Sequence, residues 1–183
     1  MSDLARRRMT SDEFIAWAME QSETEHCKLI DGEVVARAPE RSGHSLTKFH
    51  IARRRSKRAI RFVTFTPTAW LSKVDDRTVY EPDALVCCGE QLPAEAIRVT
   101  DPVITGEVLS PSKSSRDVGP KLMDYFRLLS LRHYLIVRVE NRTVVHHEHG
   151  ENGIILTRIV RDGPIMMDPP GITLADCFLP GVA

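Results

Sequence analysis

The sequence predicts one α/β domain (an α+β arrangement) with a mixed β-sheet. The chain has 183 residues, 42% of them hydrophobic and 27% charged, and this is the composition of a globular protein with a single core. Strand-like and helix-like patterns alternate along it, without an internal repeat or a low-complexity linker. We therefore expect an irregular N-terminal segment over residues 1–9 and one domain over residues 10–183.

The first elements have specific local signals. Thr10 to Glu13 has the Thr-x-x-Glu spacing of a capping box, and apolar residues at helical spacing follow it, so a helix is expected over residues 11–21. Asp31-Gly32 separates two short apolar runs, which predicts a β-hairpin with a tight turn. A second helix is expected over residues 44–60.

The rest of the chain predicts a series of strands with one more helix. Ser110 to Ser115 is expected to be a loop, and Leu122, Tyr125, Phe126 and Leu129 would share the apolar face of a helix over residues 117–129. The prolines after residue 163 predict an irregular C-terminal end. Strands are expected over residues 62–71, 79–88, 103–109, 133–139, 143–149 and 154–160, with a polar loop between the second and third.

Charge and hydropathy exclude several classes of protein. Lys and Arg number 25 and Asp and Glu also number 25, so no whole-chain field attracts nucleic acid or membrane. No apolar run approaches the roughly 20 residues of a transmembrane helix, and no secretory signal opens the chain. The four cysteines lack the Cys-x-x-Cys spacing of a zinc ribbon, and we expect reduced thiols in a cytoplasmic protein.

Two acidic residues stand inside apolar strand-like runs. Asp83 follows Pro82 and precedes an apolar run, and Glu107 has Val and Ile before it and Val and Leu after it. A buried ionised carboxylate is costly unless it is paired, protonated or bound to a metal. Two acids from neighbouring strands would make an oxygen site suited to Mg²⁺ or Mn²⁺. Either acid alone is more simply explained as a solvated strand end.

Lys121 and Tyr125 strengthen the metal-site hypothesis. They are four residues apart in the helix expected after Glu107, so they share one face of it. A strand–loop–helix unit returns that helix over the sheet, near the C-terminal end of the strand. An ammonium beside two carboxylates and a metal can hold an attacking water or stabilise charge on a phosphate. By itself, Lys121 would be an ordinary exposed lysine.

Together these residues resemble a known family. Pro82-Asp83, Glu107-Val108-Leu109-Ser110-Pro111-Ser112 and the Lys121-x-x-x-Tyr125 helix, in this order, are similar to the bacterial "putative restriction endonuclease" domain family. That family belongs to the PD-(D/E)XK, restriction-endonuclease-like nucleases. The resemblance covers about residues 10–180.

The resemblance implies a restriction-endonuclease-like fold, in which helices flank a central mixed β-sheet. It also implies a Mg²⁺-dependent or Mn²⁺-dependent endonuclease that hydrolyses DNA phosphodiester bonds. Asp83 and Glu107 would bind the metal and, with Lys121, form the catalytic set, while Tyr125 and His44 would support them. The lysine expected two residues after the acid is Leu109 here, and Lys121 matches the place of a lysine moved to the following helix. The family usually has Glu where this chain has Lys28, which adds a positive charge.

Basic and histidine-rich segments supply further candidates. Arg53, Arg54 and Arg58 belong to a basic segment over residues 48–61 that contains no acid, and we expect it to contact DNA phosphates. A solvated helix face is the alternative. His44 is more simply explained as a helix N-terminal residue. His146, His147 and His149 lie without an acid or cysteine at metal-ligand spacing, which favours a surface hairpin over a metal cluster.

These residues leave three functions open. The first is the metal-dependent endonuclease, and the second is a nucleic-acid-binding protein whose nuclease site has decayed, as Lys28 would indicate. The third is a glycosidase that uses Asp83 and Glu107 as acid and base, but aromatic residues total only 6%. A homodimer is expected by analogy, because cleavage of both strands of a duplex needs two sites.

Overall fold

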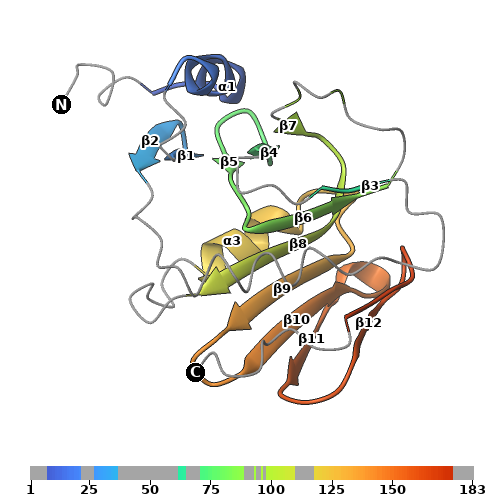
Figure 1. Ribbon diagram of the computed structural model, residues 1–183. Coiled ribbons are helices and arrows are strands. Elements are labelled where there is room, and N and C mark those ends of the chain that lie inside the picture. Colours follow the sequence, from blue (N-terminus) through green and yellow to red (C-terminus); the bar gives the residue numbers. More distant parts are fainter. Residues whose placement is uncertain are drawn as a thin grey trace. The chain divides into compact units, whose positions relative to one another are not determined.

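Two sheets organise the part of the chain that the computed structural model describes, which is residues 8–21, 27–36, 62–64, 71–88, 93, 96, 98–109 and 118–174 (Figure 1). The chain divides into two compact units, and each unit contains one of these sheets. The first unit draws on residues 1–39, 66–82 and 92–100, and the second on the remainder. The single domain over residues 10–183 stays a prediction.

The first unit contains one helix and a sheet of five strands among its described residues. The strand order is β2-β1-β5-β4-β7, and neighbours are antiparallel except β4 and β7. Phe14, Leu29 and Val79 are fully buried in its core. The elements are α1 (Ser11–Met19), β1 (Cys27–Ile30), β2 (Glu33–Ala36), β4 (Leu71–Lys73), β5 (Val79–Tyr80) and β7 (Arg98–Val99).

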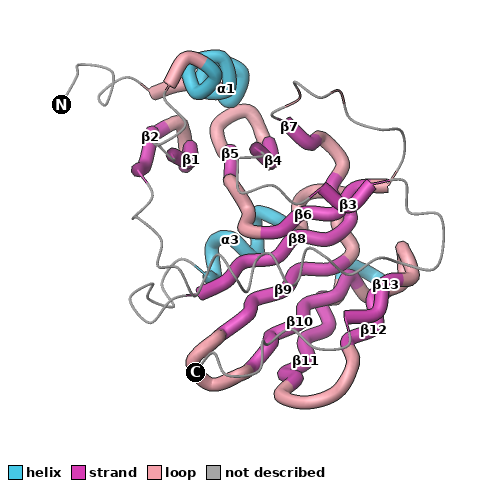
Figure 2. The backbone as a smooth tube through the Cα atoms, viewed as in Figure 1, coloured by secondary structure: helices cyan, strands magenta, loops and turns pink. Residues whose placement is uncertain are grey.

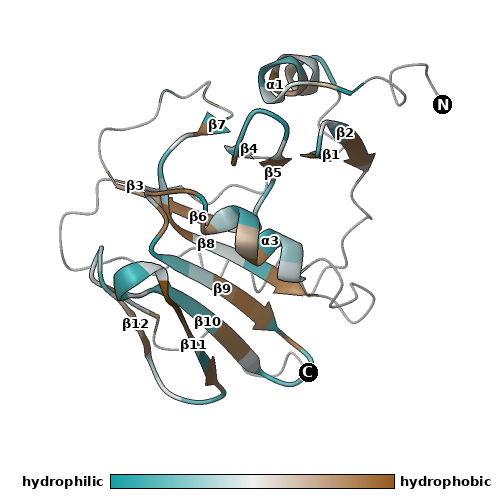
Figure 3. Cartoon of the chain, turned by 180° about the vertical axis from the view of Figure 1, so that it is seen from behind, coloured by the Kyte–Doolittle hydropathy of each residue, from teal (hydrophilic) through white to brown (hydrophobic). Residues whose placement is uncertain are grey.

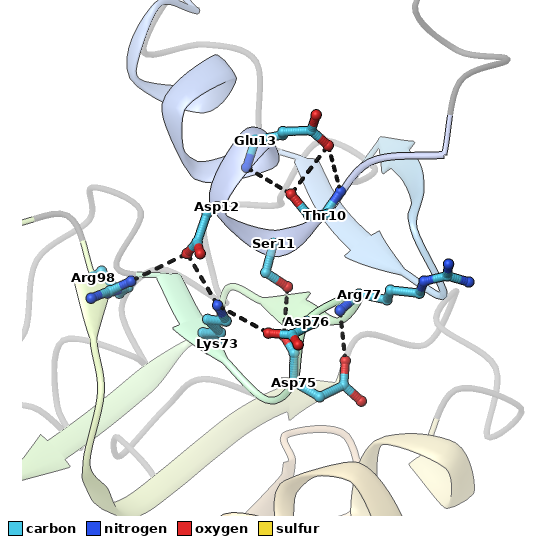
Figure 4. Close-up of polar contacts among 9 residues, drawn as sticks. All are labelled: Thr10, Ser11, Asp12, Glu13, Lys73, Asp75, Asp76, Arg77 and Arg98. Atoms are coloured by element: carbon cyan, nitrogen blue, oxygen red, sulfur yellow. Dashed lines mark hydrogen bonds and ion pairs between the residues drawn. The ribbon is translucent and has the colours of Figure 1, made fainter.

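Local sequence determines how the first unit starts. The predicted capping box is present: the Glu13 amide donates to Thr10 Oγ1 at 3.2 Å, and the Thr10 amide donates to Glu13 Oε2 at 2.8 Å (Figure 4). The predicted hairpin is confirmed as β1 and β2, with positive φ at Asp31 (50°) and Gly32 (82°). A Cβ on Gly32 would also lie 3.1 Å from the Met9 carbonyl oxygen, so glycine suits this turn.

An ion-pair network joins the start of α1 to the strands of the same unit. Asp12 lies 3.1 Å from Lys73 Nζ and 3.5 Å from Arg98 Nη1, and Lys73 also pairs with Asp76 at 3.4 Å (Figure 4). These carboxylates raise the pKa of Lys73, with the hydrogen bond to Asp12 as the main cause. Acidic residues at a helix N-terminus also interact favourably with the helix dipole.

The second unit contains the mixed sheet that the sequence predicts. Among the described residues its strand order is β11-β10-β9-β8-β6-β3, and β8 and β9 form its parallel pair. Parallel neighbours need a crossover connection, and α3 lies between them in the chain. The elements are β3 (Phe62–Thr64), β6 (Ala84–Cys87), β8 (Pro102–Leu109), α3 (Val118–Tyr125), β9 (His133–Arg138), β10 (Thr143–His149), β11 (Ile155–Val160), β12 (Ile165–Met167) and β13 (Ile172–Leu174).

Different elements pack against the two faces of this sheet. On one face, Leu135, Val137 and Val144 form a buried apolar cluster with Ile165 and Ile172 of the β12–β13 hairpin (Figure 2). The other face is covered by α3, which lies across the sheet in Figure 3. Side chains alternate between faces along a strand, so Leu135 and Val137 of β9 point into this cluster, whereas Ile136 and its partner Glu107 of β8 lie on the face that α3 covers.

Four sequence predictions need correction. Residues 62–71 are not one strand, because Phe62–Thr64 form β3 of the second sheet and Leu71 begins β4 of the first. Residues 79–88 are not one strand: Pro82 has no amide hydrogen to donate, and the run divides into β5 of the first sheet and β6 of the second. The helix predicted to reach residue 129 ends at Tyr125, and Leu129 is 90% exposed. The loop after residue 88 contains the two-residue strand β7.

The C-terminal region is more regular than predicted. Ile165, Met167, Ile172 and Leu174 are buried in the β12–β13 hairpin, and they alternate with exposed residues as strand residues do. Among the described prolines of this region, Pro169 and Pro170 lie in the turn at residues 168–171 and Pro164 precedes β12, so they interrupt no ladder.

Candidate active site

Asp83 and Glu107 come together at one end of the six-stranded sheet. β6 and β8 are antiparallel, and Ala84 pairs with Gly106, so the next residue along each strand places Asp83 beside Glu107. Asp83 Oδ2 also accepts a hydrogen bond from the Val108 amide at 2.7 Å. This bond fixes the Asp83 carboxylate against the strand that carries Glu107. The two acids that the sequence singled out are therefore neighbours in space.

Glu107 is held by two donors from α3. Its side chain is only 5% exposed, and its Oε1 lies 2.7 Å from Lys121 Nζ. The Tyr125 hydroxyl donates to the same oxygen at 3.2 Å. Lys121 and Tyr125 are one helical turn apart, so both reach Glu107 from the same face of the helix. The cost of burying the carboxylate is offset by a charged donor and a neutral donor.

The two oxygens of Glu107 have different surroundings. Oε1 accepts both hydrogen bonds from α3, whereas Oε2 accepts none from any described residue. Two donors on one oxygen restrict rotation of the carboxylate, and they leave the second oxygen with its full capacity for another ligand. The geometry thus distinguishes the two oxygens of Glu107: Oε1 is fixed to the helix, and Oε2 has no donor among the described residues.

Behind Tyr125, aromatic rings extend across the sheet. The Tyr125 ring centroid lies 5.0 Å from that of Tyr134, and Tyr134 stacks on His147 at 5.9 Å. His147 Nδ1 lies 2.8 Å from Thr157 Oγ1 on the neighbouring strand. Burial lowers the pKa of His147, which favours the neutral ring in this row. Sequence reasoning missed Tyr134 and His147, although the alternation of β9 could have placed Tyr134 on the face of Glu107.

The donor set fits a hard divalent cation. Asp83 and Glu107 supply carboxylate oxygens, and Mg²⁺ is commonly held by one or two carboxylates while waters and substrate phosphate complete its shell. No group of three or more His, Cys, Asp or Glu side chains suited to a metal occurs among the residues that the structure describes. A two-carboxylate site for Mg²⁺ or Mn²⁺ is therefore the arrangement that these residues support.

The other candidates predicted from the sequence are not among the described residues of the second unit. The helix predicted over residues 44–60, with His44, Arg53, Arg54 and Arg58, lies outside the described residues, as does the loop predicted over residues 110–115. Lys28 lies in β1 of the first unit, while Asp83 and Glu107 belong to the second. Of the site residues predicted from the sequence, Asp83, Glu107, Lys121 and Tyr125 are the four that the described structure brings together.

His146 and His147 of β10 are buried, so for these two residues the prediction of a surface hairpin is wrong. His146 and His147 are 1% and 6% exposed, because both faces of β10 are covered. His146 Nε2 lies 3.0 Å from His133 Nδ1, and His133 Nε2 lies 2.9 Å from the Pro169 carbonyl oxygen in the β12–β13 turn. A carbonyl can only accept, so His133 Nε2 carries the hydrogen and its Nδ1 accepts from His146. Both rings are then neutral.

We expect this neutral pair to make folding stability pH-dependent. Burial lowers the pKa of His133, and burial together with the nearby His133 lowers that of His146 to about 4. The unfolded chain therefore binds protons before the folded protein does, so stability is full above about pH 6.5 and falls as the pH approaches 4. Urea unfolding should show a loss of roughly 1–2 kcal/mol between pH 7 and pH 5.

A matched pair of variants tests this assignment. His146→Gln removes the buried titrating group and should flatten the pH dependence of stability between pH 7 and 5. His149→Gln replaces the half-buried histidine three residues along the same strand, and the pH dependence of stability should then stay as in the wild type. An equal pH dependence in all three proteins would mean that the His133–His146 contact does not control stability.

Comparisons with known proteins agree with this architecture. The family model Uma2, described as "Putative restriction endonuclease", matches residues 11–176. A solved structure, that of a putative nuclease belonging to DUF820 from Anabaena variabilis, superposes with a TM-score of 0.66 at 17% sequence identity. The match covers 91% of this chain and 94% of that one, and it shows a common fold. No curated protein matches the chain.

The described helices are short. None of them has both the length and the apolar character needed to cross a membrane.

Proposed function

The chain belongs to the Uma2 family, described as "Putative restriction endonuclease", and from this premise we propose that it hydrolyses DNA phosphodiester bonds with a divalent cation held by Asp83 and Glu107. The observation that carries the proposal is the contact between Lys121 Nζ and Glu107 Oε1 at 2.7 Å, beside an Asp83 fixed to the same strand. A cation and two carboxylates at one strand end are the set that metal-assisted phosphoryl transfer needs.

Each residue has a separate task in this proposal. A bound Mg²⁺ or Mn²⁺ supplies Lewis-acid polarisation of the scissile phosphate and lowers the pKa of the attacking water. Glu107 and Asp83 would hold the cation through their carboxylates. The Lys121 ammonium, 14% exposed, orients the attacking water or stabilises negative charge that develops on the phosphate. Tyr125 acts through Glu107 as a positioning residue, since its hydroxyl fixes Oε1.

The test is cleavage of supercoiled plasmid in Mg²⁺, in Mn²⁺ and in EDTA. We expect conversion to open-circular or linear DNA in either metal and none in EDTA. Asp83→Asn protein, purified in parallel, controls for a contaminating nuclease. Duplex binding is measured on the same samples by fluorescence anisotropy. Binding without turnover in either metal would reject the nuclease and support a decayed, DNA-binding relative, the alternative that Lys28 favours.

Affinity for DNA is proposed to come largely from the basic segment over residues 48–61. Replacing Arg53, Arg54 and Arg58 with Ala should weaken duplex binding and reduce its salt dependence. The slope of log binding constant against log salt concentration should fall in magnitude by about 0.9 for each phosphate that the variant no longer neutralises. A triple variant of three exposed arginines elsewhere, at positions 77, 132 and 161, has the same net charge and serves as the control. Equal slopes in the two triple variants would show that the segment makes no phosphate contact.

Cleavage of both DNA strands requires two such sites, so we include a homodimer in the proposal. Sedimentation of the protein with and without a duplex gives the oligomeric state directly.

A further inference from the structure

Arg138 lies at the same end of the sheet as the acidic pair. It is the last residue of β9, and it pairs with Leu109 of β8 and with Thr143 of β10. Two residues earlier on the same strand, Ile136 pairs with Glu107. Because side chains two residues apart share a face, Arg138 projects from the face on which Glu107 contacts α3. The neighbouring Val137 points to the opposite face, into the apolar cluster.

The backbone spacing brings Arg138 within reach of a substrate bound at Glu107. Two residues along a strand span about 6.6 Å, and neighbouring strands lie about 4.8 Å apart. The Arg138 Cα is therefore about 8 Å from that of Glu107. It is displaced toward the C-terminal end of the parallel pair. A long side chain from this position can contact a phosphate next to the one that lies at the acids.

The guanidinium of Arg138 lacks the carboxylate partner that Arg127 and Arg158 have in the same part of the chain. Its Nε is buried and makes no hydrogen bond with any described residue, and its guanidinium forms no ion pair among them. By contrast, Arg158 lies 2.8 Å from Glu148, and Arg127 lies 3.7 Å from Asp124. A half-buried guanidinium without an anion is unfavourable, and its planar fork of donors matches phosphate oxygens. A phosphate is the ligand that this position is suited to take.

We propose that Arg138 binds a backbone phosphate of the DNA strand that is cleaved at Asp83, Glu107 and Lys121. This inference rests on the nuclease function proposed above, and it adds a substrate contact that lies on a rigid strand of the sheet. The contact is independent of base sequence, so it places the strand in register with the acids without selecting a site.

The experiment compares two arginines of the same strand. Arg132 precedes β9 at its other end and is exposed, so Arg132→Gln removes the same charge far from the acids and is the matched control for Arg138→Gln. Duplex affinity is measured by anisotropy in EDTA, which prevents cleavage, over a range of salt concentrations. We expect Arg138→Gln to bind about tenfold more weakly, with a log–log slope lower by about 0.9, and Arg132→Gln to keep the wild-type slope.

A second measurement uses the wild-type protein, so it does not require any variant to fold. Phenylglyoxal modifies accessible guanidinium groups, and mass spectrometry of the wild-type protein reports each arginine separately. DNA should protect Arg138 and leave Arg132 reactive. Equal modification with and without DNA, or equal slopes in the two variants, would overturn the inference.

The outcomes also separate this inference from the proposed function. If the wild-type protein cleaves plasmid in Mg²⁺ while Arg138→Gln and Arg132→Gln bind alike, the phosphate contact is wrong and the nuclease stands. If Arg138→Gln binds more weakly but the wild-type protein cleaves in no metal, the contact stands and the nuclease is wrong. A wild-type protein that binds no duplex would reject both.

Discussion

Replacing Lys121 with methionine should reduce the rate of DNA cleavage by about 10²–10³-fold, the usual effect of removing one preorganised charged donor from an active site. Methionine keeps most of the apolar stem and removes the ammonium that lies 2.7 Å from Glu107 Oε1. Affinity for Mg²⁺ should hold or rise, because a nearby cation repels the metal. Single-turnover cleavage and a Mg²⁺ titration of the same protein separate the two effects.

The same substitution should lower stability when no metal is present. It leaves the buried Glu107 carboxylate without its charged partner, and we expect a loss of roughly 2–3 kcal/mol in EDTA that added Mg²⁺ largely restores. Lys121→Arg, which keeps the charge, is the control and should recover part of the activity. Full activity in Lys121→Met would mean that another group orients the water, and that Lys121 is only a structural partner of Glu107.

Replacing Glu107 with glutamine should have the largest effect on cleavage, about 10³-fold or more, because the variant loses both a metal ligand and the partner of Lys121. An amide oxygen is a weaker ligand for Mg²⁺ than a carboxylate. Thermal melting with increasing Mg²⁺ should show little of the metal-induced stabilisation expected of the wild-type protein. Cleavage that persists at the wild-type rate would remove Glu107 from the metal site.

The stability of Glu107→Gln should also differ from what the sequence alone suggests. Two bare acids would repel each other, and on that basis an amide should not destabilise the protein in EDTA. The structure instead pairs Glu107 with Lys121, so glutamine breaks a buried ion pair and should lower the melting temperature. The double variant Glu107→Gln, Lys121→Met removes both charges and should be more stable than either single variant, which a double-mutant cycle measures.

Local signals explain most of what the sequence predicts correctly. The Thr10 capping box, the Asp31-Gly32 turn and the apolar run of β9 each depend on a few adjacent residues, and each appears in the structure where it was expected. The strand over residues 79–88 failed for a reason present in the sequence: Pro82 precedes Asp83 and ends one ladder before the next begins. The C-terminal hairpin was not predicted, because the prolines near residue 169 indicated irregular structure. Each of its strands has only three residues, which is too short for a clear pattern of alternating buried and exposed side chains.

The site was predictable where residues are close in sequence or belong to a recognisable order. Pro82-Asp83, Glu107 and the Lys121-x-x-x-Tyr125 spacing point to one cluster, and the described structure places all four chemical groups there. Burial of His146 and Tyr134 depends on which elements cover each face of the sheet, and this is a tertiary property. Arg138 was missed for the same reason, because its relation to Glu107 depends on the pairing of β8 with β9.

The central claim is that Asp83 and Glu107 bind the cation on which cleavage depends, and one titration tests it most directly. Melting temperature and plasmid cleavage are measured on the same samples of wild-type and Asp83→Asn protein as Mg²⁺ is raised from zero. In the wild type, Mg²⁺ at 100 times its dissociation constant should raise the free energy of unfolding by about 2.7 kcal/mol, and cleavage should appear over the same range of Mg²⁺ concentrations. Asp83→Asn should lose both responses together. Cleavage that survives in Asp83→Asn with the wild-type metal dependence would contradict this claim.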